Sequence, residues 1–193
     1  MPPIKGTRTE KNLAISYASE LMAQNRYLTF SGIAIKQGYE QIGAIFAETA
    51  ANEKEHAKIF LKHLGGETPN IHVQLEIPSF FKGSTLENLK FSAGGENEEH
   101  TSMYPHMAAI AEQEGFEEIA KSFRMIALVE QKHELRFSKL AEQVKEGTVF
   151  KKKRIVSWKC RNCGYVTEGY EAPAECPSCA HPQAYFEIQE LLE

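Results

Sequence analysis

The chain has 193 residues, of which 42% are hydrophobic and 25% charged, enough for one sizeable domain or for one domain with a small satellite. All 26 acidic residues are glutamates, and the net charge of -4 does not indicate a general nucleic-acid-binding protein. No apolar run approaches the roughly 18 residues of a membrane span, and the opening MPPIKGTRTEKN lacks the apolar core of a signal peptide. We therefore expect no membrane partner and a cytoplasmic location.

Two helices are predicted in the N-terminal third of the chain. Residues of one helical face recur in alternating steps of four and three over 13–34 and again over 42–60. The second pattern stops at Gly65-Gly66, a pair typical of a helix C-terminal cap. The connection that follows, about twenty residues with Pro69 and Pro78, is long enough for a crossover.

Two further helices are predicted after this connection. The third is expected to begin near Ser84 or Thr85 and to continue past Ile110. Pro105 lies inside it and predicts a kink. The fourth carries its pattern over 119–140 and is expected to end near Gly147.

The second and fourth helices repeat each other at a separation of 77 residues. Both contain Glu-x-x-His with a Phe four residues beyond the His, in NEKEHAKIF and VEQKHELRF. The shift aligns Gly38 with Gly115, Tyr39 with Phe116, Glu40 with Glu117, Ile42 with Ile119, Phe46 with Phe123, Glu53 with Glu130, His56 with His133, Phe60 with Phe137 and Tyr27 with Tyr104. It takes Glu20 to Asn97, between Glu96 and Glu98, so the shift fixes the register of the third helix only to within about one residue. A duplicated helix pair predicts a four-helix bundle with pseudo-twofold symmetry.

Carboxylates interrupt the helix faces that should be buried: Glu20, Glu53, Glu96 and Glu130 lie on them, and Glu99 lies beside one. An unpaired buried carboxylate costs several kcal/mol. Either these residues lie at the edge of each face beside Lys or Arg, or a cation lies between them. The repeated Glu-x-x-His, with a Glu on each remaining helix, favours the cation, because this spacing brings a carboxylate and an imidazole to one helix face. Two such helices can hold two metals.

The ligand types indicate which metals these are. Oxygen-rich ligation with one or two His per metal suits iron or manganese better than zinc. The five carboxylates carry a charge of -5, against +4 for a di-ferrous and +6 for a di-ferric pair. Both states leave the site within one unit of neutrality, which indicates redox chemistry rather than a structural metal.

The four cysteines form two Cys-x-x-Cys pairs near the C-terminus, Cys160 with Cys163 and Cys176 with Cys179. Such paired motifs are a strong signal for one tetrahedral metal, and disulfides are not expected in a reducing cytoplasm. A module of about forty residues cannot support a large core, so the metal is expected to supply much of its folding energy. The spacing leaves zinc and iron open, and the redox-active bundle beside it favours iron.

The composition changes after Gly147, where KKKR at 151–154 is the predicted linker. We therefore predict a bundle over 1–150 and a cysteine module over 151–193, with the linker at about 147–154. KKKR could also suggest nucleic acid, but four basic residues at a domain junction are usually solvated linker.

Taken together, these motifs resemble the rubrerythrin family over nearly the whole chain. The resemblance rests on Glu20 with Arg26-Tyr27, FAETAANEKEHA at 46–57, TLENLK at 85–90, GENEEHTSMYP at 95–105, Glu130-x-x-His133 and the two cysteine pairs. It implies a mainly α fold, a ferritin-like four-helix bundle with a di-iron site, followed by a small β-rich rubredoxin-like iron domain. The implied activity is that of a non-haem peroxidase that reduces hydrogen peroxide to water and protects against oxidative stress. Its electrons would come from an external donor, a rubredoxin or an NAD(P)H-dependent reductase, through the rubredoxin-like iron.

The resemblance also implies the site residues. The di-iron ligands would be Glu20, Glu53, His56, Glu96, Glu99, Glu130 and His133, and the single iron would be bound by Cys160, Cys163, Cys176 and Cys179. Glu53 and Glu130 would bridge the irons, and Glu99 would exchange for His56 as one iron changes oxidation state. Tyr27 and Tyr104 are either hydrogen-bond partners of ligand carboxylates or buried structural tyrosines. Glu98 stands where the family often has an aromatic residue, and it is left outside the ligand set.

Two other functions compete with the peroxidase. The bundle could be a ferritin-like ferroxidase, or a metal-binding scaffold with a zinc-ribbon interaction module. The attached module favours the peroxidase over the ferroxidase, because iron storage needs no electron carrier. A head-to-tail homodimer is also expected, because His133 lies roughly 20 Å from the end of its helix and antiparallel protomers would bring each module beside the partner's bundle.

Overall fold

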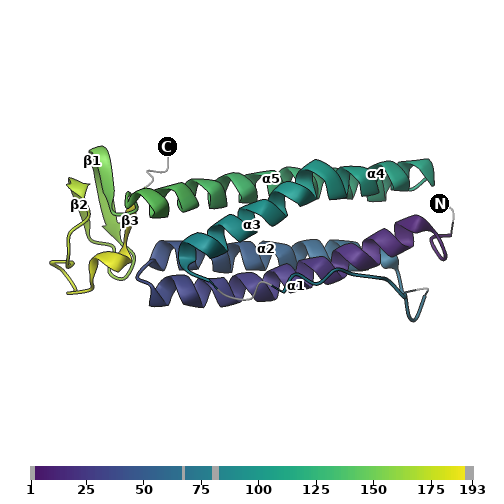
Figure 1. The fold of residues 1–193 in the computed structure, drawn as a ribbon, viewed down its shortest axis with the longest axis horizontal. Helices are drawn as coiled ribbons and strands as arrows, with labels where there is room; N and C mark the ends of the chain where they lie inside the picture. The colour runs from purple at the N-terminus through teal and green to yellow at the C-terminus, as the bar shows by residue number, and fades with distance from the viewer. Residues whose placement is uncertain (1–2, 67, 80–82, 190–193) are drawn as a thin grey trace.

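The structure, a computed structural model, describes residues 3–66, 68–79 and 83–189. The described helices are α1 (Arg8–Lys36), α2 (Glu40–Leu64), α3 (Thr85–Glu98), α4 (Tyr104–Gln113) and α5 (Glu117–Glu146). A π-helical turn, η1 (Glu99–Met103), joins α3 to α4, so these two form one arm of a four-helix bundle. Figure 1 shows a small sheet at the end of this bundle, where α5 ends and α1 turns into α2. The predicted fold class, a mainly α bundle with a small β-rich domain, is confirmed.

The helix ends follow the residues that predicted them. Ser84 and Glu87 form a capping box at the start of α3, each side chain accepting a hydrogen bond from the backbone of the other. Gly65 after α2 and Gly147 after α5 are left-handed, with φ of 66° and 65°. The predicted starts and stops are confirmed at these positions.

The turn between helices occurs twice with the same geometry. Gly38, between α1 and α2, and Gly115, between α4 and α5, both have φ of 83°. In each turn the next residue's N–H returns to a carbonyl five residues earlier, at 2.9 Å from Tyr39 to Ala34 and at 2.8 Å from Phe116 to Ala111. These positions correspond under the shift of 77, which confirms the pseudo-twofold duplication.

The π turn explains why the third helix is out of register. Tyr104 donates its N–H to the carbonyl of Glu99, five residues back, so this turn takes in one residue more than an α-helical turn. Glu96 precedes Tyr104 by eight residues, whereas Glu20 precedes Tyr27 by seven. The extra residue therefore lies in η1. This turn directly precedes Pro105, near the start of α4, and the kink predicted there stays a prediction.

Two aromatic clusters of the core lie on either side of the central polar residues. In one, Phe137 contacts Tyr27 and Phe46, with ring centroids 5.4 and 5.0 Å apart. In the other, Phe60 contacts Tyr104 and Phe123 at 5.7 and 5.1 Å. Each ring of the first cluster is the repeat partner of one in the second, so the bundle encloses its centre symmetrically.

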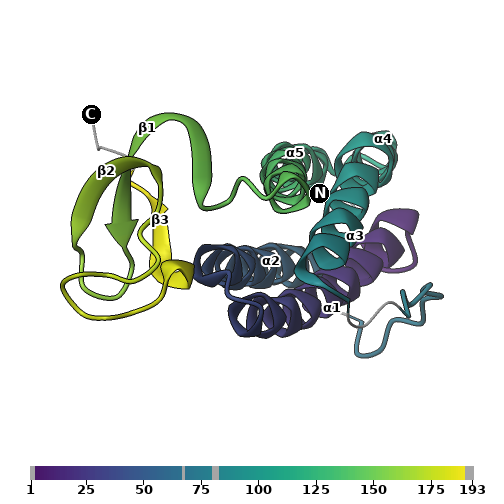
Figure 2. The same cartoon turned by 60° about the vertical axis from the view of Figure 1, so that its left-hand side comes forward.

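The C-terminal module is a three-stranded antiparallel sheet in the order β2-β1-β3, built from β1 (Lys151–Cys160), β2 (Val166–Glu171) and β3 (Phe186–Ile188). Trp158 and Phe186 are buried in its core beside Cys160 and Cys176. Figure 2 shows β1 curving from the end of α5 into the sheet.

The expectation that KKKR is a linker is wrong, because these residues lie within β1. Lys151 pairs with Glu171 across the sheet, and the register then shifts before Val156. The apolar residues Ile155 and Val156 follow the four charges within the same strand, and side chains that are exposed, or nearly so, do not prevent the backbone of this segment from pairing with β2. The boundary at 150/151 stays a prediction.

Within the described ranges, no helix combines the length and the apolarity that a membrane crossing needs.

Candidate metal centres

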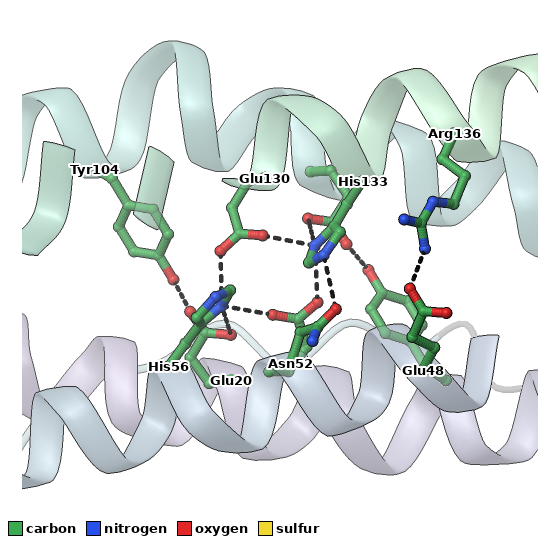
Figure 3. Close-up of polar contacts among 11 residues, drawn as sticks. Glu20, Glu48, Asn52, His56, Tyr104, Glu130, His133 and Arg136 are labelled. Atoms are coloured by element: carbon green, nitrogen blue, oxygen red, sulfur yellow. Dashed lines mark hydrogen bonds and ion pairs between the residues drawn. The ribbon is translucent and has the colours of Figure 1, made fainter. Parts of the chain in front are cut away.

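Six of the predicted residues meet at the centre of the bundle in two overlapping groups. One group is Glu20, Glu53, His56 and Glu130, and the other is Glu53, Glu96, Glu130 and His133. In each group one ligand atom per residue lies within 4.8 Å of the others. Glu53 and Glu130 belong to both groups, so each can reach two metals. All four long arms of the bundle contribute, and Figure 3 shows the side chains converging between the helices.

These carboxylates are buried without a permanent cation. Glu20, Glu53, Glu96 and Glu130 are each at most 1% exposed. Among the described residues, no lysine or arginine forms an ion pair with any of them; their only ion-pair partners are the two histidines. The expectation that they might lie at the edge of each helix face beside Lys or Arg is therefore excluded. A cluster of this charge requires bound cations.

The atoms are spaced like neighbouring ligands of one metal. Nδ1 of His56 lies 2.9 Å from oxygens of both Glu53 and Glu130. Nδ1 of His133 lies 2.8 Å from Glu130 and 3.2 Å from Glu53. Two ligands at about 2.1 Å from a metal and at right angles would be about 3 Å apart.

Several of these buried atoms have no hydrogen-bond partner. They are one oxygen each of Glu20, Glu53 and Glu96, both oxygens of Glu130, and Nδ1 of His133. The short distance from His133 to Glu130 is thus not accompanied by hydrogen-bond geometry. Orphaned donor atoms that face one another suit a pair of metal ions, and the residues present fit the predicted group.

Without metals, the histidines must hold the positive charge. Burial would lower the pKa of His133, but the adjacent carboxylates of Glu130, Glu53 and Glu96 outweigh it and raise the pKa to about 12. The pKa of His56 is raised for the same reason. Burial raises the pKa of Glu96 to about 8, with Glu53 and Glu130 adding to the shift. Metal binding must therefore displace protons from this centre.

Glu53 shows the opposite shift because it lies between both imidazoles. Burial alone would raise its pKa, but the adjacent imidazoles of His133 and His56 outweigh this and lower the pKa to about 2. Glu53 is thus an anion under all ordinary conditions, as a bridging ligand must be.

Each tyrosine hydrogen bonds to a carboxylate of one group. The hydroxyl of Tyr27 donates to Glu96, and the hydroxyl of Tyr104 donates to Glu20. Burial, followed by the nearby carboxylates, raises the pKa of both tyrosines, so both remain protonated donors. Both tyrosines thus have the hydrogen bonds to ligand carboxylates that one of the two interpretations requires, and both are also buried in the core.

Glu99 lies in η1, is half-buried and is in neither group. Burial raises its pKa, and Glu20 is the neighbouring charge that adds most to the shift. Glu98 is exposed. The structure therefore brings together six of the seven predicted di-iron ligands and leaves the seventh beside them.

Two contacts around this centre were not anticipated from the sequence. Nε2 of His133 lies 3.3 Å from Oδ1 of Asn52. His100 in η1 pairs with Glu134 at 2.6 Å and ties the π turn to α5. Asn52 could have been found, because the repeat places Val129 at the corresponding position and thus breaks its own symmetry there.

The four cysteine sulfurs form a second candidate site. The Sγ atoms lie 3.8 Å apart for Cys160 and Cys179 and 3.6 Å apart for Cys163 and Cys176, too far for a disulfide. A tetrahedral metal with sulfur ligands at about 2.3 Å requires sulfurs about 3.8 Å apart. The geometry therefore fits one metal bound by four thiolates.

The two cysteine loops have the same backbone geometry. The N–H of Cys160 donates to Tyr165 and that of Cys176 donates to His181, both at 2.8 Å. The residue after the second cysteine of each pair has a positive φ, 78° at Gly164 and 56° at Ala180. A backbone hydrogen bond with His181 lowers the pKa of Cys179 to about 6, which favours the thiolate that a metal binds.

The fold and these sites define a helical-bundle protein with a dimetal centre of carboxylates and histidines and a separate four-thiolate site. The sequence profile of the family described as "Rubrerythrin" matches residues 11–141, and that of "Rubrerythrin, rubredoxin-like domain" matches residues 158–187. The chain belongs to the rubrerythrin family. Its cofactors are accordingly a di-iron centre in the bundle and a rubredoxin-type iron in the module.

Individual relatives match over nearly their whole length. A rubrerythrin of Clostridium perfringens is 50% identical over 190 residues, which cover 97% of each chain. A rubrerythrin of Nitratidesulfovibrio vulgaris is 49% identical over 188 residues, also covering 97% of each. Among solved structures, a fully reduced, all-ferrous nigerythrin has a TM-score of 0.64 at 28% identity, covering 96% of this chain and 91% of the other.

Proposed function

We propose that this oxidoreductase is a peroxidase that reduces one hydrogen peroxide, with two electrons and two protons, to two molecules of water. The observation that carries the proposal is the pairing of two sites in one chain. Two ligand groups that share Glu53 and Glu130 suit a two-electron centre, and the four-thiolate site suits a one-electron carrier. A ferroxidase would use the bundle alone and leaves the module without a role.

We propose the following ligands for the di-iron centre: Glu20, Glu53, His56, Glu96, Glu99, Glu130 and His133. Glu53 and Glu130 would each hold both irons, which is supported by their membership of both groups. Glu99 is the ligand that exchanges for His56, which is supported by its position outside the groups and beside Glu20. Cys160, Cys163, Cys176 and Cys179 hold the single iron, within a domain that begins at about residue 151.

When bound, the iron pair supplies the two electrons that peroxide accepts, and the thiolate-bound iron relays their replacement from outside. The protein's own residues hold this centre and exclude water from it. Tyr27 and Tyr104 donate hydrogen bonds that orient Glu96 and Glu20. The aromatic rings on either side keep the dielectric constant low, which strengthens each of these interactions.

The electron donor is proposed to be a separate protein, a rubredoxin or an NAD(P)H-dependent reductase. The four free thiols agree with a reducing compartment, and we place the protein in the cytoplasm. Peroxidase activity is tested by reducing the protein anaerobically and comparing its oxidation by hydrogen peroxide with that by dioxygen. The proposal expects peroxide to react faster by at least tenfold. Faster oxidation by dioxygen, or turnover only with added Fe²⁺, would favour the ferroxidase.

We further propose that the protein is a head-to-tail homodimer with electron transfer between subunits. From His133, α5 continues for roughly 20 Å before the module begins, and Figure 1 shows the module beyond the end of the bundle. An antiparallel partner would place each module beside the other bundle.

Subunit exchange tests this arrangement. One variant lacks the module iron (Cys160→Ser with Cys163→Ser), and the other lacks the di-iron site (Glu53→Ala with Glu130→Ala). Mixed dimers should regain turnover at one of their two sites. No recovery, despite demonstrated exchange, would mean that electrons pass within one chain.

A further inference from the structure

The duplicated centre is not symmetric around its two imidazoles. The shift of 77 relates every residue of the two Glu-x-x-His pairs, but it pairs Asn52 on α2 with Val129 on α5. Asn52 thus provides an amide group beside one half of the centre. Val129, at the matching position of the other half, has no polar side-chain atom.

His133 has a hydrogen bond at Nε2, on the side of the ring away from the carboxylates, whereas its Nδ1 has no hydrogen-bond partner. Its Nδ1 faces Glu130 and Glu53 at 2.8 and 3.2 Å, and its Nε2 lies 3.3 Å from Oδ1 of Asn52. Figure 3 shows Asn52 below His133, on the helix opposite. With Nε2–H donating to the amide oxygen, the ring presents Nδ1 to a metal in a fixed orientation.

His56 has its hydrogen bond at the other ring nitrogen, Nδ1, with Glu53 as the partner. Its Nδ1 faces Glu53 and Glu130, both at 2.9 Å, but its Nε2 makes no hydrogen bond with any residue in the described ranges. Val129 cannot supply that bond. The second departure from symmetry concerns Glu99. The shift of 77 relates it to Met22, and the shift of 76 that aligns Glu96 with Glu20 relates it to Ala23; neither residue has a carboxylate. His56, the imidazole without a hydrogen bond at Nε2, belongs to the same half of the centre as Glu20. Glu20 is also the charged residue that acts most strongly on Glu99.

We infer that Asn52 is a positioning residue that makes His133 a permanent ligand, and that the apolar Val129 at the matching position leaves His56 as the one exchangeable imidazole. This inference rests on the proposed di-iron ligands. It adds a physical reason why His133 and His56 differ as ligands. A hydrogen-bond partner behind a ligating histidine typically contributes a factor of about 10–100 in metal affinity. The two irons are accordingly held with different strength in the reduced state.

Loss of iron to a chelator tests the inference without any turnover. The reduced holoprotein is mixed anaerobically with an excess of a ferrous chelator, and iron release from the bundle is followed while the thiolate-bound iron serves as the internal reference. The wild-type protein should lose its two bundle irons in two phases, with rates that differ by about 10–100-fold.

Two variants should shift these phases in opposite directions. Asn52→Val makes the halves alike and should merge the phases by accelerating the slow one, whereas Asn52→Gln keeps the amide and should restore it. Val129→Asn offers His56 a partner and should slow the fast phase. Asn25→Val, the same replacement at an exposed position of α1, should leave both rates unchanged.

Unchanged phases in both Asn52→Val and Val129→Asn would overturn the inference. If Asn52→Val fails to fold, as loss of the module's colour and of helical circular dichroism would show, Asn52→Gln and Val129→Asn decide the matter. Failure of the peroxidase proposal leaves this test intact, because iron release requires no peroxide. Absence of any bundle iron in the wild-type protein would instead refute the ligand assignment itself.

Discussion

Removing the hydroxyl of Tyr104 should weaken iron binding in one half of the centre. Tyr104 is fully buried, and its hydroxyl donates to Glu20, which is 1% exposed. Tyr104→Phe deletes only the oxygen and preserves the ring contacts with Phe60 and Phe123, at 5.7 and 5.8 Å. No cavity large enough to affect packing is created, so the effect isolates the hydrogen bond.

The magnitude follows from the charge of the acceptor. A hydrogen bond to a charged group contributes about 1.5–3 kcal/mol, and no water can replace it at this depth. At 1.4 kcal/mol per factor of ten, the affinity of the Glu20 half for Fe²⁺ should fall by roughly 10–100-fold. Tyr27→Phe should do the same to the half that contains Glu96.

The assay is anaerobic competition for Fe²⁺ against a chelator, with the two bundle sites resolved from the thiolate site by its absorbance. Tyr17→Phe is the matched control, because Tyr17 packs half-buried against the same cluster and its hydroxyl makes no hydrogen bond within the described residues. Equal Fe²⁺ affinities in Tyr104→Phe and Tyr17→Phe would refute the reasoning.

Three further predictions concern the same centre. Glu53→Ala and Glu130→Ala should each abolish bundle iron while leaving the thiolate iron, because two cations would share one anion fewer; full occupancy by elemental analysis in either variant would remove the bridging role. His56→Ala should retain an oxidised iron pair but react more slowly with peroxide after reduction, by at least tenfold in stopped-flow measurements, and an unchanged rate would exclude His56 from the reaction. The metal-free protein should become less stable as the pH rises above about 4.5, because folded Glu96 (pKa about 8) and His133 (pKa about 12) retain protons that the unfolded chain releases. Both shifts act in the same direction over this range, so a flat urea-denaturation profile between pH 5 and 8 would contradict them.

Most of the bundle could be predicted from the duplicated pattern, because each half of the repeat contains its own helix spacing and turn glycines. The spacing of Glu53 and His56 is set within one helix, and the shift to Glu130 and His133 carries it to the other. Local signals of this kind, including the glycines at the turns, require no knowledge of tertiary packing. The four-cysteine metal site was predictable for the same reason, because the spacing within each Cys-x-x-Cys pair is local.

The remainder depended on packing that the repeat does not encode. The extra residue before Tyr104 is visible in the sequence as a break in register. That it is taken up in a π turn, where His100 pairs with Glu134 of α5, depends on contacts between helices. The contact of Asn52 with His133 crosses from α2 to α5 and has no counterpart in the other half. The segment KKKR was predicted to be a linker because of its charge, whereas its place in β1 depends on pairing with β2.

The proposed peroxidase reaction is tested most directly by a single turnover in which the absorbance of the di-iron centre and that of the thiolate-bound iron are both followed. The protein is reduced completely without oxygen and mixed with one equivalent of hydrogen peroxide. The account predicts that the di-iron absorbance appears first, with all the peroxide consumed, and that oxidation of the thiolate iron follows as its electron passes to the bundle. Oxidation of the thiolate iron while the bundle stays reduced, or peroxide left unconsumed, would contradict it.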